Sequence, residues 1–255
     1  MRRVILLGAS NVTIGFPLIV QTLRASLGPV ELLAAHGHGR SYGMTSRVLV
    51  RTLPGIRKCG LWDALEQGED HDARPLALVT DVGNDVIYGV PVERILGWVD
   101  ECLARLVGMN ACISVTMLPL RSIQSLGRVR FEVTRRLFFP THGPRWEDVQ
   151  QIAPELDAKL REIAEQRGAA VVSPRDEWYG FDPIHIRRRH RLGAWREYFS
   201  AWPEFADRAG LTRPPRAERM RVHCARPASR TVFGRDQETR QPAIEFADGT
   251  SVSIY

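Results

Sequence analysis

The sequence predicts a three-layer α/β/α sandwich built on a parallel sheet, and three observations lead to this prediction. Short apolar runs of strand length alternate along the chain with segments that have apolar residues at helical spacing. The chain has 255 residues, which suits one large domain or one domain with an appendage. Its composition, with 44% hydrophobic and 25% charged residues, excludes a disordered chain, a collagen-like chain and a disulfide scaffold.

Five apolar runs are predicted to form a five-stranded parallel sheet. The first run ends in a glycine turn, which is typical of a buried parallel strand. Right-handed crossovers between parallel strands would place helices on both faces of the sheet. The five predicted strands are Val4–Leu7, Val30–Ala35, Leu76–Thr80, Ala111–Leu118 and Ala169–Ser173.

Four segments between these strands and one after the last of them are predicted to be helical. Pro17 suits the first position of a helix, and apolar residues follow it at helical spacing. Pro54-Gly55 would end the second helix. The first predicted helix begins at Pro17, and the others are Thr45–Leu53, Val92–Val107, Pro154–Arg167 and His190–Ala201.

Two regions fall outside this alternation. We assign residues 1–202 to the α/β/α domain and residues 203–255 to a C-terminal extension. In the extension, Asp248-Gly249 lies between two apolar stretches, which predicts a terminal β-hairpin. Residues 119–147 are long for a connection and rich in arginine and phenylalanine, which predicts either a lid or an amphipathic helix with a solvated basic face.

The net charge is +6, and arginine supplies nearly all of the positive charge because Lys58 and Lys159 are the only lysines. The arginines are spread along the chain, so we interpret the charge as a preference for arginine over lysine and expect no nucleic-acid partner. The four cysteines form no CxxC pair and have no zinc-ligand spacing, which predicts free thiols in a reducing compartment. The first apolar run is too short for a signal peptide or a membrane span, so we expect a cytoplasmic location.

Polar residues follow four of the predicted strands, at the sheet edge where open α/β folds form their sites. The four segments are Gly8-Ala9-Ser10-Asn11, His36 to Gly43, Asp81-Val82-Gly83-Asn84-Asp85 and Asp182-Pro183-Ile184-His185. They supply a serine, glycines, an asparagine and an Asp/His pair. A serine needs a base to become a nucleophile, a histidine can be that base, and an aspartate can orient its ring. Backbone N–H groups and an amide can bind the developing oxyanion, so the set fits acyl transfer.

The four segments, in this order, resemble the motifs of the SGNH hydrolases, the superfamily of GDSL-type esterases and lipases. The resemblance implies that Ser10 is the nucleophile, His185 the base and Asp182 the residue that orients it. It also implies a flavodoxin-like α/β/α fold, a small-molecule or glycan ester as substrate, and a reaction without a metal or an organic cofactor.

The same resemblance implies an oxyanion hole made of the Ser10 N–H, the Gly39 N–H and the Asn84 amide, with Gly43 as the alternative to Gly39. The first motif departs from the family pattern, because Ala9 stands where an aspartate is common. The missing carboxylate is not part of the triad, so we expect catalysis to survive.

Three alternatives compete with this hypothesis. Gly39-Arg40-Ser41-Tyr42-Gly43 fits the GxSxG nucleophile elbow, which would make Ser41 the nucleophile. The glycines at residues 37, 39 and 43 faintly resemble a dinucleotide fingerprint, although the chain has no Tyr-x-x-x-Lys motif. A non-catalytic binding module for an anionic partner is the third alternative. The histidines other than His185 are interpreted as surface or packing residues, because His36 and His38 have no partner at metal-ligand spacing.

Overall fold

The computed structural model describes residues 1–68, 73–128, 131–132, 144–206 and 214–255. His71 and His142 lie outside the described residues, and so does much of the arginine-rich connection, including residues 129–130 and 133–143. The lid interpretation of that connection therefore stays a prediction. Within the described part of the chain, none of the helices has the length and apolar character that crossing a bilayer requires.

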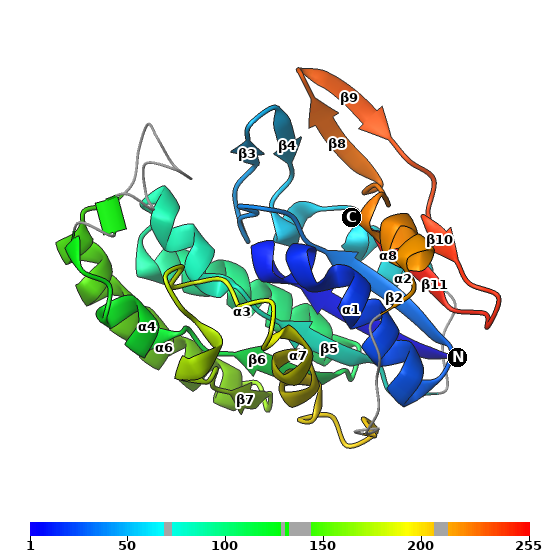
Figure 1. The fold of residues 1–255 in the computed structure, drawn as a ribbon, viewed down its shortest axis with the longest axis horizontal. Coiled ribbons are helices and arrows are strands. Elements are labelled where there is room, and N and C mark those ends of the chain that lie inside the picture. The colour runs from blue at the N-terminus through cyan, green and yellow to red at the C-terminus, as the bar shows by residue number, and fades with distance from the viewer. Residues whose placement is uncertain (69–72, 129–130, 133–143, 207–213) are drawn as a thin grey trace.

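A seven-stranded sheet forms the centre of the molecule, in the order β10-β11-β2-β1-β5-β6-β7 (Figure 1). The five predicted strands are present, and neighbouring ones pair in parallel. Their bounds are β1 (Arg2–Leu7), β2 (Val30–Ala35), β5 (Leu76–Val79), β6 (Cys112–Thr116) and β7 (Ala170–Val172). The α/β/α prediction is therefore confirmed.

The predicted terminal hairpin extends the same sheet. It consists of β10 (Ile244–Glu245) and β11 (Ser251–Ile254), which pair with each other in antiparallel fashion. β11 also pairs in parallel with β2, so the sheet has two strands more than the five predicted. The division of the chain at residue 202 stays a prediction.

The central strand β1 is buried on both faces. Val4 to Leu7 are 0% exposed, and their side chains alternate between two apolar clusters. Ile5 and Leu7 pack into one cluster, while Val4 and Leu6 pack into the other. Burial of a side chain of this size contributes about 1.5–3 kcal/mol, which explains why this short apolar run is a reliable strand signal.

Helices cover both faces of the sheet (Figure 1). One face is covered by α2 (Leu61–Gln67), α3 (Val92–Gly108), α4 (Leu120–Gln124) and α6 (Trp146–Gln166). The other is covered by α1 (Ser10–Leu27), α7 (Arg191–Phe199) and α8 (Arg216–His223). The described residues also form three 3-10 helices, η1 (Ile56–Lys58), η2 (Val82–Tyr88) and η3 (Asp176–Trp178).

Two predicted helix starts are wrong, and both errors come from a proline. Helix α1 begins at Ser10, so Pro17 lies inside it rather than at its first position. Helix α6 begins at Trp146, where the Asp148 carboxylate accepts a hydrogen bond from the Arg145 N–H at 3.0 Å, and contains Pro154. Each interior proline removes one backbone hydrogen bond, and the apolar face of each helix packs against the sheet in spite of this loss.

The predicted helix over Thr45–Leu53 is also wrong. This segment forms the hairpin of β3 (Ser46–Val48) and β4 (Arg51–Leu53). It belongs to a second, antiparallel sheet of order β3-β4-β8-β9, completed by β8 (Ser229–Val232) and β9 (Arg235–Glu238). β-Branched residues favour a strand in this segment, and β4 finds its second partner in β8, far along the chain.

Both hairpins of the small sheet turn on bulky residues with positive φ. Leu49 has a φ of 55° and Phe233 has a φ of 50°, and their side chains are 87% and 77% exposed. The Phe233 N–H donates to the Val50 carbonyl at 2.9 Å, which joins the two turns. The left-handed conformation costs a residue with a Cβ about 1–2 kcal/mol.

Phe233→Asn should raise the free energy of unfolding by about 1 kcal/mol. Asparagine tolerates the left-handed region, and Asn-Gly is the preferred pair for a two-residue turn in which both φ angles are positive, as they are at Phe233-Gly234. Urea unfolding measures the change. Val107→Asn is the matched control. Val107 is half-exposed in α3, and valine and asparagine have similar helix propensities, so this substitution should change the stability little. An unchanged midpoint for Phe233→Asn would show that the turn is not strained.

Candidate active site

Ser10 lies at the carboxyl edge of the central strand, where β1 turns into α1. The turn requires glycine at position 8, because a Cβ there would lie 2.5 Å from the Val12 side chain and 2.8 Å from the Thr80 side chain. Ser10 is the first residue of α1, and its Oγ lies 2.8 Å from Nε2 of His185. The structure therefore brings together two predicted residues that are 175 positions apart in the sequence.

The other ring nitrogen of His185 contacts the predicted aspartate. Nδ1 lies 2.6 Å from Oδ2 of Asp182, and Oδ1 of Asp182 accepts the backbone N–H groups of Ile184 and His185, both at 3.1 Å. Burial by itself raises the pKa of the Asp182 carboxyl, but the hydrogen bond and the charge of His185 outweigh it and lower this pKa below its ordinary value. An ionised Asp182 favours a proton on Nδ1, which leaves Nε2 free to accept the proton of Ser10.

Asn84 lines the same cavity as Ser10. It lies in η2. This helix begins directly after Asp81, whose φ is 60°. Its side-chain amide donates one hydrogen bond to the Arg40 carbonyl at 3.0 Å, and this bond fixes the amide group. An amide nitrogen carries two protons, so a second one is available to a ligand.

The two candidate glycines differ in what their N–H groups do. The Gly43 N–H donates to Ser41 Oγ at 3.1 Å, and the Trp98 ring occupies the space beside its Cα. Within the part of the chain that the structure describes, the Gly39 N–H makes no hydrogen bond. Gly39 has a φ of +63° and is not among the residues that line the cavity of Ser10. Of the two candidate N–H groups, the one on Gly39 is therefore the group that is not already bonded to another described residue.

The contacts of Ser41 argue against the alternative nucleophile. Ser41 is 0% exposed, its hydroxyl donates to Asp85, and its Oγ accepts the N–H groups of Gly43 and Met44. The second carboxylate oxygen of Asp85 accepts the Tyr42 N–H at 2.9 Å. These bonds make Ser41 a structural link between the second and third motifs.

Asp81 and Asn11 are site residues whose role the sequence reasoning missed. One carboxylate oxygen of Asp81 accepts the N–H groups of Ala9 and Asn11, at 2.9 and 3.0 Å. The other accepts the Asn11 side-chain amide at 2.9 Å. A carboxylate is therefore present at the start of α1 even though Ala9 replaces the common aspartate of the motif. It comes from the end of β5 instead, 72 residues from Ala9.

Asn11 also holds the loop that carries the histidine. Its Nδ2 donates to the Ile184 carbonyl at 2.8 Å, and its Oδ1 accepts the Ile186 N–H at 3.0 Å. These two residues flank His185 on either side. Asn11 was visible beside Ser10 in the first motif, but no sequence signal identifies partners more than 170 residues away.

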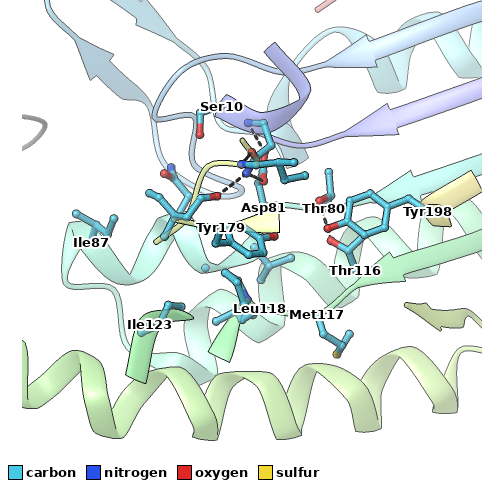
Figure 2. A pocket seen from close by; sticks show the side chains of 17 residues that line it. Ser10, Thr80, Asp81, Ile87, Thr116, Met117, Leu118, Ile123, Tyr179 and Tyr198 are labelled. Atoms are coloured by element: carbon cyan, nitrogen blue, oxygen red, sulfur yellow. Dashed lines mark hydrogen bonds between the residues drawn. The ribbon is translucent and has the colours of Figure 1, made fainter. Parts of the chain in front are cut away.

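A cavity of about 70 Å³ opens beside Ser10 (Figure 2). Figure 2 shows Ser10 on one side of it and Leu118 and Ile123 on the opposite side. Most of the lining side chains are apolar, and the hydroxyls of Thr80 and Thr116 hydrogen-bond to each other at 2.7 Å. The cavity suits a small apolar group placed within reach of the serine hydroxyl.

The nearby His36 is a packing residue. Its ring lies 4.3 Å from that of Phe16, and its Nδ1 lies 3.0 Å from Thr13 Oγ1. Burial, followed by the charges of Arg40 and Arg51, lowers the pKa of His36 to about 3, which keeps the ring neutral. Among the described residues no group of three or more His, Cys, Asp or Glu side chains is arranged to hold a metal ion.

Stability should depend on pH through Asp85. Burial raises the pKa of this carboxyl from 3.8 to about 6, and the hydrogen bonds from Ser41 and Tyr42 only partly offset the effect. Between pH 4 and 6 the unfolded chain loses this proton while the folded chain keeps it. The stability of the wild type relative to Asp85→Asn should therefore be highest below pH 4 and fall by about 3 kcal/mol by pH 6. Urea unfolding of both proteins across this range measures the difference, and a constant difference would contradict the prediction.

The sequence matches no family model and no curated protein. Solved structures do match the fold. One is the psychrotrophic esterase EstA from Pseudoalteromonas sp., in a structure inhibited by monoethylphosphonate, with 15% identity over 79% of this chain and 96% of that chain and a TM-score of 0.50. Another is a member of the lipolytic G-D-S-L family from Veillonella parvula, with 10% identity over 79% of this chain and 98% of that chain and a TM-score of 0.52. At this identity the match shows the fold, and the chain has the fold of the SGNH hydrolases.

Proposed function

We propose that the protein is a serine esterase or acyl hydrolase that cleaves an ester through an acyl-enzyme on Ser10. The observation that carries the proposal is the continuous hydrogen-bonded chain from Ser10 through His185 to Asp182, at 2.8 and 2.6 Å. The fold supports it, because one of the solved structures that share this fold is an esterase. No metal or organic cofactor takes part in the proposed reaction.

In the first half of the reaction, Ser10 Oγ attacks the ester carbonyl while His185 Nε2 takes the serine proton. Asp182 stabilises the imidazolium that forms. The carbonyl oxygen becomes an oxyanion, which accepts hydrogen bonds from the Ser10 N–H, the Gly39 N–H and the Asn84 amide. Ser10 is the first residue of an 18-residue helix, so the helix dipole adds positive potential at the same place.

In the second half, the tetrahedral intermediate collapses and the alcohol leaves with the proton that His185 returns to it. A water molecule then gives a proton to His185 and attacks the acyl carbon. The second intermediate releases the carboxylic acid and restores Ser10 with its proton. The cavity beside Ser10 favours a small acyl group, because its volume of about 70 Å³ leaves little room for a long chain and its lining is largely apolar.

Labelling with a neutral fluorophosphonate probe tests the nucleophile, because this probe reacts with activated serines. Peptide mass spectrometry should find the adduct on Ser10. Ser10→Ala should abolish the labelling, and Ser41→Ala, the control variant, should retain it if the variant folds. An adduct on Ser41 would replace the proposed nucleophile, and an unlabelled, folded wild type would favour the non-catalytic binding module.

Asn11→Ala should slow hydrolysis by lowering kcat with a smaller effect on KM, because Asn11 acts by holding His185 in place. We expect a loss of about 10- to 100-fold, which is the order expected when catalytic groups move by ~1 Å. Asn11→Asp, which keeps the acceptor for the Ile186 N–H, should lose the side-chain amide bonds to Asp81 and Ile184 and recover little activity. Steady-state kinetics with p-nitrophenyl acetate measure the effects on kcat and on KM separately. Equal kcat values for Asn11→Ala and wild type would remove Asn11 as a positioning residue.

A further inference from the structure

The segment directly after His185 is strongly basic. It reads Ile186-Arg187-Arg188-Arg189-His190-Arg191, and the proposed triad uses none of these arginines. Two of them, Arg188 and Arg191, line a second cavity of about 110 Å³. Arg219 of α8 is the third arginine in the lining, and most of the remaining wall is apolar and comes from α1. Among the described residues, the lining consists of Ile14, Gly15, Pro17, Leu18, Arg188, Arg191, Pro214 and Arg219.

Of the residues that the structure describes, none that lines this cavity is acidic. Elsewhere the chain pairs many of its arginines with carboxylates, for example Arg167 with Asp100 at 2.8 Å. Over the described residues, Arg188, Arg191 and Arg219 form no ion pair. Glu218, the carboxylate next to Arg219 in the sequence, contacts Arg24 instead, at 2.7 Å.

The arginines of the cavity are close enough to repel each other. Burial, followed by the charge of Arg188, lowers the pKa of Arg191. The Arg191 Nε donates to the Ile186 carbonyl at 3.0 Å, which holds its guanidinium group in place. A bound anion would offset the repulsion and supply acceptors for several guanidinium N–H groups.

Two walls of the cavity belong to segments that also carry the proposed catalytic residues. Ile14 follows Ser10 by one turn of α1, which is about 6 Å along the helix axis at 1.5 Å per residue. Arg191 is tied to Ile186, the residue after His185. Helix α1 also packs against both α7, which begins with Arg191, and α8, which contains Arg219 (Figure 1).

We propose that this cavity is an anion subsite that binds a carboxylate or phosphate group of the ester substrate. The proposal rests on the proposed esterase function and narrows its substrate class to esters that carry a negative charge near the scissile bond. The apolar cavity beside Ser10 would then receive the acyl group, while Arg188, Arg191 and Arg219 bind the charged part of the alcohol.

Three phenyl acetates test the proposal: methyl 4-acetoxybenzoate, which is neutral, 4-acetoxybenzoate, and 4-acetoxyphenyl phosphate. The measured quantity is the ratio of kcat/KM for each anionic ester to that for the neutral ester. Comparing this ratio between proteins cancels the intrinsic reactivity of the esters. In Arg188→Gln/Arg219→Gln the ratio should fall by about tenfold or more, the loss expected for one charge-assisted contact. A fall for only one anion would identify the group as carboxylate or phosphate.

Arg94→Gln/Arg240→Gln is the matched control. Both residues are exposed and unpaired among the described residues, and the variant lowers the net charge by the same amount. It should keep the wild-type ratio. Fluorophosphonate labelling of Ser10 verifies that each variant is folded around its active site. An equal ratio in wild type and Arg188→Gln/Arg219→Gln, or an equal fall in the control, would overturn the subsite.

A binding measurement separates failure of the subsite from failure of the esterase function. Calorimetry with Ser10→Ala protein compares 4-acetoxybenzoate with its methyl ester in the absence of turnover. We expect tighter binding of the anion, and we expect Arg188→Gln/Arg219→Gln in the same background to abolish the difference. If the wild-type protein hydrolyses none of the three esters but the Ser10→Ala protein prefers the anion, the esterase function would be refuted and the subsite kept. Hydrolysis of the neutral ester without any anion preference would do the reverse.

Discussion

The carboxylate of Asp81 is the constraint on which the arrangement of the candidate site depends. It accepts two backbone N–H groups at the start of α1 and the side-chain amide of Asn11. Asn11 in turn holds the backbone on both sides of His185. Three segments that leave different parts of the sheet are thereby joined by short, well-defined bonds. Each of these contacts gives the carboxylate a hydrogen-bond donor, so the bonds stabilise its ionised form together.

The sheet places these segments before any polar contact is made. β1 and β5 are neighbours in parallel register, so Ala9 and Asp81 emerge side by side at the same edge. The burial of β1 on both faces and its parallel pairing with β2 and β5 hold the strand at the centre of the core. The apolar core therefore determines where the polar groups of the site can meet.

Sequence reasoning succeeded where a signal is local. Strands buried on both faces have continuous apolar runs, so the five central strands and the parallel sheet could be predicted, and the motifs at their ends followed from that sheet. Sequence reasoning failed where contacts with residues far away in the sequence determine the secondary structure. Residues 45–53 form a hairpin because β8 pairs with β4. Helices α1 and α6 begin several residues before the prolines that we predicted as their first residues. The bonds of Asn11 and the cavity at Arg219 could not be predicted because they join segments that no local pattern relates.

The pairing of β11 with β2 has a consequence for synthesis of the chain. During translation, β2 is complete about 216 residues before β11 emerges, since the two strands end and begin at residues 35 and 251. At 5–20 residues per second this interval lasts roughly 10 to 40 seconds. Throughout it, β2 presents an open edge of apolar residues to other nascent chains. The small terminal hairpin thus acts last, as the element that covers the β2 edge of the growing sheet.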